Sequence, residues 1–211
     1  PNQMSNVFTG IGISTYTVTV TDFNGCTVTS VIPVINNNAP NITSVNATNI
    51  LCYGGNTGSI ITNVTGGVGV LNYQLQPLGI TNSNGIFPNL TANNYTISVT
   101  DANNCSATSN VILTQPPMLM WDSVDNRDVA CYGGGNGVVT SSASGGSGLI
   151  TYNLLPTNVV NYTGVFFGLG VGQYTLTATD TNGCVVTAVF QINQPPPITW
   201  TTVTVNPVSC I

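Results

Sequence analysis

The six cysteines of this 211-residue chain recur at regular spacing, and no other feature constrains the fold as strongly. They lie at positions 26, 52, 105, 131, 184 and 210, so two spacings alternate, one of 26 and one of 53. The two spacings together make the sequence period, which is 79. The segment Cys-Tyr-Gly-Gly at 52–55 returns at 131–134, and Tyr16, Tyr95 and Tyr174 share one position of the period. The chain is therefore predicted to be a tandem array of similar units.

The period also predicts the domain boundaries. Residues 1–40 correspond to the C-terminal part of a truncated repeat, and residues 41–118 and 119–197 to two complete repeats. Residues 198–211 match only the beginning of a repeat, which we expect to be its first strand. Proline-rich segments at 115–117 and 194–197 mark the ends of the repeats, and such segments form short, semi-rigid connectors.

Within each repeat the local signals are those of β-strands. Residues 95–100 (Tyr-Thr-Ile-Ser-Val-Thr) alternate apolar and hydroxyl side chains, which is typical of a half-buried strand. An Asp-x-Asn-Gly turn follows the equivalent strands, with Asn104 in place of glycine in the middle copy, and a cysteine opens the next strand. We therefore predict an all-β fold of tandem immunoglobulin-like β-sandwich repeats with the period of 79, each closed by a disulfide.

The composition excludes several classes of function. The chain has one Lys or Arg, six Asp or Glu and no His. One Arg cannot neutralise a nucleic-acid backbone, and the side chains that most acid–base catalysis uses are almost absent. No apolar run approaches the roughly 20 residues of a membrane-spanning helix. We expect no enzyme, no cofactor, no nucleic-acid partner and no membrane insertion in this segment.

The cysteines are expected to form disulfides, because no close Cys-x-x-Cys pair suits a zinc site. One pairing joins Cys52 to Cys105 and Cys131 to Cys184, and leaves the partners of Cys26 and Cys210 outside the sequence. The other pairing joins neighbouring cysteines across the shorter of the two spacings and so uses them all. We favour the first, because Cys52 at the start of the first strand would lie near the last hairpin of its own repeat. Either pairing implies an oxidising, extracellular compartment.

Three further groups are candidate sites. The turn aspartates Asp22, Asp101 and Asp180 are expected to accept hydrogen bonds from their own turns rather than to bind calcium. Acidic side chains at the boundary between repeats could begin a calcium site, although the next repeat lacks them. Two tryptophans could stack on glycans, although packing at the repeat boundary suits them better. These residues are Asp122, Asp125 and Asp128 for calcium, and Trp121 and Trp200 for glycan contact.

The motif set resembles the SprB-type repeats of large cell-surface adhesins from gliding Bacteroidetes. It consists of Cys-Tyr-Gly-Gly-x-x-Gly, then Gly-Gly, then Gly-x-Tyr-Thr-x-Thr-x-Thr-Asp-x-Asn-Gly-Cys, and ends in Gln-Pro-Pro. The middle copy departs from it by carrying asparagines in place of glycines at residues 93 and 104. The resemblance implies a long secreted protein that the type IX system exports and displays as a surface filament. Asp-Ser-Val at 122–124 also resembles the short O-glycosylation signal of Bacteroidetes, with Ser123 as the acceptor.

These observations favour a structural stalk or spacer segment of a secreted, cell-surface bacterial adhesin, related to gliding motility. Its partners would be the neighbouring repeats of the same chain, surface polysaccharide or other filament chains. A self-assembling extracellular fibre, joined by strand exchange through the incomplete end units, is the first alternative. A carbohydrate-binding module is the second.

Overall fold

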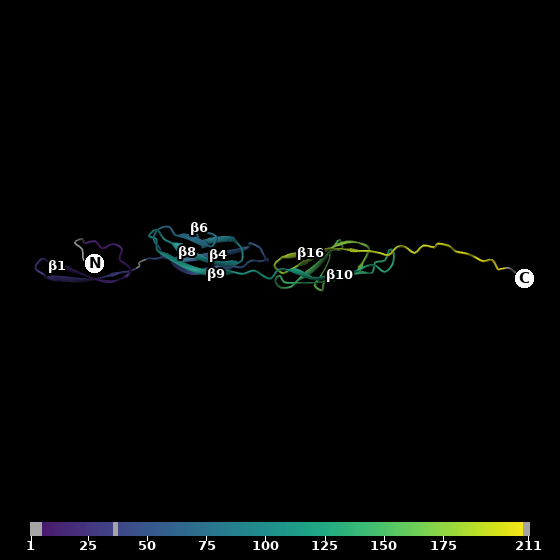
Figure 1. Cartoon of the computed structure of the whole chain (residues 1–211), viewed down its shortest axis with the longest axis horizontal. Helices are drawn as coiled ribbons and strands as arrows, with labels where there is room; N and C mark the ends of the chain where they lie inside the picture. Colours follow the sequence, from purple (N-terminus) through teal and green to yellow (C-terminus); the bar gives the residue numbers. More distant parts are fainter. Residues whose placement is uncertain (1–5, 36–37, 209–211) are drawn as a thin grey trace. The chain divides into compact units, whose positions relative to one another are not determined.

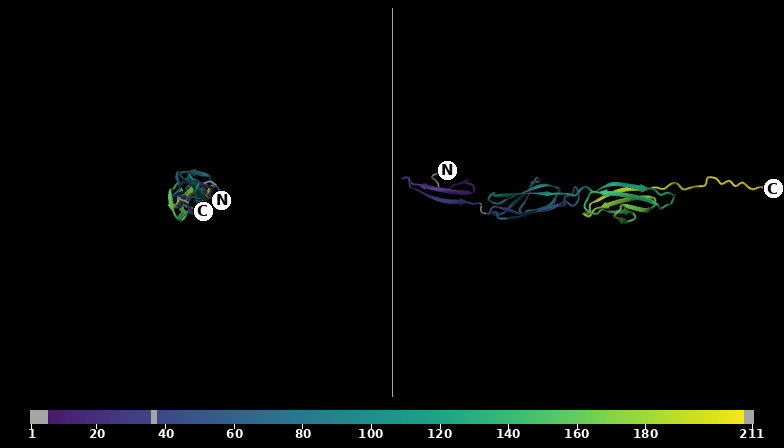
Figure 2. Two further views of the ribbon diagram at one scale, coloured as in Figure 1. Left: turned by 90° about the vertical axis from the view of Figure 1, so that its left-hand side faces the viewer. Right: turned by 90° about the horizontal axis from the view of Figure 1, so that it is seen from below.

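The computed structural model describes residues 6–35 and 38–208, and every regular element in these ranges is a β-strand (Figures 1 and 2). None of the described residues forms a helix long and apolar enough to cross a membrane. The strands are β1 (Ser14–Thr21), β2 (Thr27–Val34), β3 (Asn41–Thr48), β4 (Gly58–Thr65), β5 (Asn72–Gln76), β6 (Ile80–Asn82), β7 (Ile86–Leu90), β8 (Asn93–Thr100), β9 (Ser106–Leu113), β10 (Met120–Arg127), β11 (Gly137–Ser144), β12 (Thr151–Leu155), β13 (Val159–Asn161), β14 (Val165–Leu169), β15 (Gly172–Thr179) and β16 (Val185–Ile192).

Strands β10 to β16 form two antiparallel sheets, one ordered β10-β11-β14 and the other β13-β12-β15-β16. In immunoglobulin notation these are A-B-E and C′-C-F-G. The fourth strand therefore pairs with C, whereas constant-type immunoglobulin domains pair it with E. Strands β3 to β9 repeat the same order, and each begins one sequence period before its counterpart in β10 to β16. The fold is an all-β, immunoglobulin-like sandwich.

Residue contacts divide the chain into two compact units, and each has buried apolar side chains. The first unit includes residues 61–86 and 95–111. The second includes residues 47–60 and 87–94 together with the chain from residue 112 onward. The loop that contains Cys52 and the hairpin that contains Cys184 therefore belong to the same unit.

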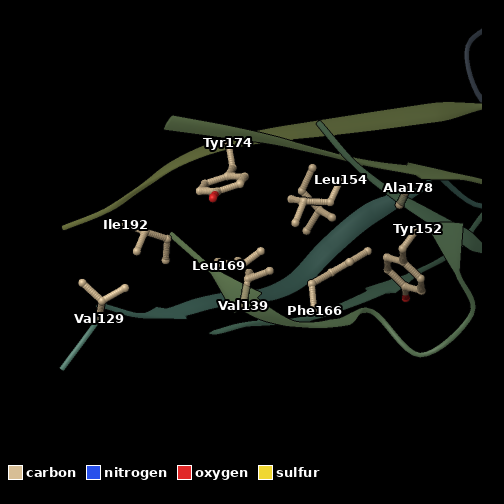
Figure 3. Close-up of a cluster of buried hydrophobic side chains, with 10 residues drawn as sticks. Val129, Val139, Tyr152, Leu154, Phe166, Leu169, Tyr174, Ala178 and Ile192 are labelled. Carbon is tan, nitrogen blue, oxygen red and sulfur yellow. The ribbon is translucent and has the colours of Figure 1, made fainter. Parts of the chain in front are cut away.

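The core of the second unit lies between its two sheets (Figure 3). On β15, Tyr174, Leu176 and Ala178 are buried and alternate with threonines that are only partly buried. The alternation expected from the sequence is thus confirmed, here and in Tyr95, Ile97 and Val99 of β8. The full cluster is Val129, Val139, Tyr152, Leu154, Phe166, Leu169, Tyr174, Leu176, Ala178 and Ile192.

A tyrosine that begins strand F bonds back to the preceding loop. The hydroxyl of Tyr174 donates to the carbonyl oxygen of Gly170 at 3.1 Å, and that of Tyr16 donates to Gly12 at 2.9 Å. This is the tyrosine corner found in immunoglobulin-like sandwiches. It explains why tyrosine occupies this position of the period, which sequence reasoning recognised only as an inward-facing residue.

The hairpin turns have the conformation that their sequences predict. Gly25 and Gly183 adopt φ values of 83° and 82°, a left-handed region that side chains with a Cβ rarely enter. Asn104 takes their place in the middle copy with φ of 63°. Asparagine is one of the few other residues that tolerate this conformation, so the substitution preserves the turn.

The two ends of the chain differ in how much structure they form. Strands β1 and β2 form a two-stranded sheet in which Tyr16 faces Ile32, the same register that pairs Tyr174 with Phe190. Residues 193–208 form no regular secondary structure (Figure 1). The first strand expected from residue 198 is therefore not present in the described residues. Its counterpart β10 is held by pairing with β11, and no strand within the described ranges pairs with residues 198–208.

We expect Tyr174→Phe to destabilise the second sandwich by about 1 kcal/mol, because the change removes a hydroxyl hydrogen bond from a largely buried side chain. Chemical denaturation followed by fluorescence measures the difference. Tyr162→Phe is the matched control, since Tyr162 is 64% exposed and should change stability by less than about 0.5 kcal/mol. Equal stability of the two variants would contradict a stabilising role for the tyrosine corner.

Candidate functional site

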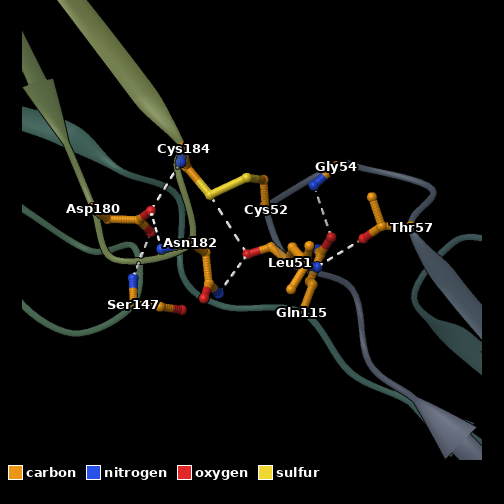
Figure 4. The surroundings of a disulfide bond; sticks show 9 residues. All are labelled: Leu51, Cys52, Gly54, Thr57, Gln115, Ser147, Asp180, Asn182 and Cys184. Carbon is orange, nitrogen blue, oxygen red and sulfur yellow. Dashed lines mark hydrogen bonds between the residues drawn. A yellow bond between two sulfur atoms is a disulfide. The ribbon is translucent and has the colours of Figure 1, made fainter.

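The structure contains one disulfide among its described residues, and it joins Cys52 to Cys184 with their Cα atoms 5.6 Å apart (Figure 4). Cys52 lies in the loop between β3 and β4, and Cys184 directly precedes β16. By the sequence period, Cys52 belongs to one repeat and Cys184 to the next. The predicted pairing of Cys52 with Cys105 and of Cys131 with Cys184 is therefore wrong. Cys105, Cys131 and Cys26 are free, and Cys210 lies outside the described residues.

The second repeat shows why a disulfide within one repeat is excluded. Cys184 precedes β16, and Gln194 follows that strand. The Gln194 side chain accepts a hydrogen bond from the Gly133 N–H at 2.9 Å, which places the loop of Cys131 at the far end of β16. Eight residues of strand span about 27 Å, whereas the Cα atoms of a disulfide lie within about 7 Å. The sequence prediction failed because it placed this loop at the entry of the first strand rather than after it.

The loop that carries Cys52 is a tight turn with a defined cap. The Gly55 N–H donates to the Cys52 carbonyl at 3.0 Å, and the Gly54 N–H donates to the side-chain oxygen of Gln115 at 2.8 Å. The Leu51 N–H donates to the Thr57 hydroxyl at 2.9 Å. Gly54 has φ of 72°, so a residue with a Cβ would be strained there. These bonds fix the backbone on both sides of the cysteine.

The hairpin that carries Cys184 is organised by the carboxylate of Asp180, which is only 5% exposed. One carboxylate oxygen accepts hydrogen bonds from the N–H groups of Asn182 and Cys184, at 2.9 and 2.8 Å. The other accepts one from the Ser147 N–H at 2.7 Å. The prediction that this aspartate caps its own turn is confirmed. The bond to Ser147 also ties the hairpin to the loop between β11 and β12.

Two further contacts join the hairpin to the loop beside the disulfide (Figure 4). The side-chain amide of Asn182 donates to the Leu51 carbonyl oxygen at 3.0 Å. The Cys184 sulfur lies 3.4 Å from the same oxygen. Because a disulfide sulfur carries no hydrogen, this second approach is a contact and not a hydrogen bond. The Asn of the turn motif thus positions the two cysteines as well as forming the turn.

The equivalent aspartate of the preceding repeat, Asp101, has a perturbed pKa. Burial alone would raise the pKa of this carboxyl group. Three backbone N–H groups oppose that effect, those of Val68 at 3.0 Å and of Cys105 and Asn103 at 2.9 Å. Together they outweigh burial and hold the pKa of Asp101 below its ordinary value of 3.8.

The three aspartates of the calcium hypothesis are not brought together. Asp122 on β10 accepts hydrogen bonds from two serine hydroxyls of β11, and Asp128 accepts one from the Asn193 N–H at 2.8 Å. Asp125 faces Thr140 in the register of the sheet. Among the described residues no group of three or more acidic, Cys or His side chains could hold a metal ion.

The two tryptophans lie in different surroundings. Trp121 packs against the core of the second unit, with its ring centroid 6.1 Å from that of Tyr152. Its indole N–H is buried without a hydrogen-bond partner, and the residue as a whole is only partly exposed. Trp200 is 90% exposed in the segment without regular structure. Ser123, the candidate O-glycosylation site, is exposed at a bulge of β10.

Sequence reasoning missed two glutamines that cap the cysteine loops. Gln115 and Gln194 had marked only the proline-rich boundary, yet each caps the turn after a cysteine. A usable signal was present: Cys52 and Cys184 are 132 residues apart, which is one long cysteine spacing plus one full period. A pairing of Cys52 with Cys184 therefore fits the sequence period. The two predicted pairings fit it equally well.

Comparison with known proteins supports the family resemblance. Residues 44–79 match the SprB repeat family, so this stretch of the chain is similar to an SprB-type repeat. This match supports a structural segment of a cell-surface adhesin. It covers β4 and β5 and the turn that carries Cys52. No curated protein matches the chain in sequence.

Similar solved structures contain several immunoglobulin domains in one chain. The N-terminal eight Ig domains of Down Syndrome Cell Adhesion Molecule align over 87% of this chain and 28% of that one, with 17% identity and a TM-score of 0.44. Sidekick-1 immunoglobulin domains 1–5 align over 87% and 46%, with 14% identity and a TM-score of 0.39. The chain thus spans less than half the length of either. The fold assignment rests on the sheet order and the tyrosine corner described above.

We expect non-reducing peptide mapping to recover one cross-linked pair of peptides, containing Cys52 and Cys184. Iodoacetamide added without reductant should label Cys26, Cys105 and Cys131, because these three thiols are free. After reduction, Cys52 and Cys184 should be labelled as well. Recovery of a Cys52–Cys105 or Cys131–Cys184 peptide from the native protein would contradict the pairing.

The pKa of Asp101 makes the folded state acid-sensitive. A carboxyl group with a lower pKa in the folded state stabilises the fold above its unfolded pKa, and this contribution disappears as the pH falls through the folded pKa. We expect Asp101→Asn to be less stable than the unchanged chain at pH 7, with the difference shrinking below about pH 4. Thermal unfolding between pH 7 and pH 2 measures it. Asp125→Asn, at an exposed position, is the control. A difference that stays constant with pH would refute the assignment.

Proposed function

We propose that this chain is a structural spacer segment of a long, secreted bacterial cell-surface adhesin. The observation that carries the proposal is the Cys52–Cys184 disulfide, which links the loop after the first strand of one repeat to the last hairpin of the next. A covalent bond between successive repeats holds the two repeats together, which suits a segment that transmits force more than one that acts as a single domain. The SprB-type repeat at residues 44–79 supports the same interpretation.

The mechanism that we propose is mechanical. The disulfide limits how far residues 52 and 184 can separate when the chain is pulled, and the proline-rich segments restrict bending at the boundaries. The surface is hydrated by amides and hydroxyls, because charged residues make up 3% of the chain. With few charges to screen, the stability of the spacer should depend little on salt.

The finer assignment follows the family resemblance. The parent protein would be a gliding-motility adhesin of Bacteroidetes, exported by the type IX system and displayed outside the cell. Its partners would be neighbouring repeats, surface polysaccharide or other filament chains. The proposal assigns no catalytic step to this segment, since the chain has no His, Lys or Glu with which to perform general acid–base chemistry.

One observation favours a second candidate, an extracellular fibre joined by strand exchange. The sheet β1-β2 has only two strands, and an apolar groove of about 450 Å³ lies over it, lined by residues that include Phe8, Ile11, Tyr16 and Ile32. A strand from another copy could cover such a face. The fibre would then assemble through the end unit rather than by continuation of one chain.

Small-angle X-ray scattering across a concentration series, without reductant, separates the two candidates. A single compact globule of this length would have a radius of gyration of roughly 17 Å. We expect a larger value that does not change with concentration, because a spacer is a monomer of separate sandwiches. A value that rises with concentration would favour the fibre, and one near that of a globule would contradict both.

A further inference from the structure

The loop of Cys131 has the same structure as the loop of Cys52, but its cysteine has no partner. The Gly134 N–H donates to the Cys131 carbonyl at 2.9 Å, as Gly55 does to Cys52 at 3.0 Å. The Gly133 N–H donates to its glutamine at 2.9 Å, against 2.8 Å in the first copy. Cys131 is free and exposed. This cysteine loop is one half-site of the disulfide. Among the described residues it therefore occurs once with its cysteine bonded and once with its cysteine free.

The complementary half-site is also present in an empty copy. The Cys105 N–H donates to the carboxylate of Asp101 at 2.9 Å, as the Cys184 N–H does to Asp180 at 2.8 Å. The N–H of each aspartate donates in turn to the carbonyl of its cysteine at 3.0 Å. The Cys105 thiol is free and only partly buried. The backbone around Cys131 and Cys105 therefore already has the conformation that surrounds the bonded cysteines.

We propose that Cys131 and Cys105 are attachment sites for further repeats of this type, through the disulfide that Cys52 and Cys184 already form. Cys131 would bond to the hairpin cysteine of a repeat that follows, and Cys105 to the loop cysteine of a repeat that precedes. The ligand is thus a second SprB-type repeat that presents an Asp-x-Asn-x-Cys hairpin or a Cys-Tyr-Gly-Gly loop. The inference rests on the proposed function, because it needs a tandem array.

The sequence period places these partners at definite positions. Cys52 and Cys184 are 132 residues apart, so Cys131 requires a cysteine at the same separation after it, and Cys105 requires one at the same separation before it. Both positions lie beyond residues 1–211, so this arrangement leaves Cys105 and Cys131 without partners within the sequence. Disulfides within each repeat would have left neither of them free.

The bond forms by oxidation of two thiols, which lose two protons and two electrons. A small-molecule disulfide such as oxidised glutathione is the oxidant. The thiolate of one cysteine attacks it, forms a mixed disulfide and releases one thiol, and the second cysteine then displaces the other. Each protein disulfide formed reduces one glutathione disulfide to two thiols, so atoms and electrons balance.

A complete set of these bonds gives the array two covalent tracks. One track crosses from Cys52 to Cys184 and follows β16 and the proline-rich segment to Cys210, where it would cross again. The other follows β9 from Cys105 and the proline-rich segment to Cys131. The residues between Cys52 and Cys105, which include β4 to β8, lie off both tracks and connect them. Tension along either track would bypass most of each sandwich.

A chain lengthened by one repeat tests the inference. A second copy of residues 119–197 is inserted after residue 197, which preserves the period, and the protein is refolded in reduced and oxidised glutathione. We expect non-reducing peptide mapping to find Cys131 joined to the added copy's equivalent of Cys184, with Cys52–Cys184 retained. Cys105 should still react with iodoacetamide, because this insertion supplies no partner for it. A free Cys131, a Cys131–Cys184 bond or loss of the free Cys105 thiol would overturn the proposal.

A matched variant guards against random oxidation. In the lengthened chain, Cys52→Ser removes one joint and should make Cys184 reactive toward iodoacetamide while Cys131 stays joined to the added copy. A bond between Cys131 and the released Cys184 would mean that any free thiol can serve as the partner, whatever its position in the sequence.

Scattering from the same samples separates the pairing proposal from the spacer proposal. A lengthened chain that is monomeric but has a free Cys131 contradicts only the pairing, whereas one that is paired but oligomerises with concentration contradicts only the spacer.

Discussion

The Cys52–Cys184 joint between the two repeats depends on the hydrogen bonds of one buried carboxylate, that of Asp180. In a chain with almost no charged residues, this anion is removed from water and must be compensated by hydrogen bonds. Its three donors come from the turn, from the cysteine and from the neighbouring loop at Ser147. The same three hydrogen bonds therefore stabilise the charge, close the hairpin and fix the backbone at Cys184.

The scarcity of charge gives these hydrogen bonds a larger role than they have in most domains. Surface ion pairs contribute little to stability in any case, so losing them costs the fold little. Hydroxyls and amides, in contrast, can bond to backbone groups inside loops, as the Gln115 amide and the Thr57 hydroxyl do around Cys52. A chain built from asparagine, threonine and glycine can therefore specify its loops as closely as its strands.

The sequence predicted the strands and turns well and the cysteine pairing badly, for one physical reason. Alternation in β8 and the positive φ at Asn104 are local properties, which neighbouring residues determine. Pairing depends on which end of the sandwich each loop occupies. The prediction placed Cys52 at the start of the first strand, whereas β3 ends at Thr48 and the cysteine follows it. One misplaced strand moved the cysteine to the wrong end. The cap formed by Gln115 has no local signature at all, since it lies 61 residues from Gly54.

Chain entropy does not explain why the disulfide joins residues so far apart. In the loop-closure model the stabilisation grows only with the logarithm of loop length. Closing the loop from Cys52 to Cys184 instead of the loop from Cys52 to Cys105 adds about 0.8 kcal/mol. Two disulfides, one within each repeat, would have stabilised the two sandwiches more than a single disulfide between the repeats does. The arrangement therefore does not maximise the stability of each domain. Its distinctive consequence is that residues 52 and 184 stay joined when a sandwich between them unfolds, so the 132 residues of separation cannot be pulled out to their full length. Bonds within single repeats would limit extension only inside each sandwich.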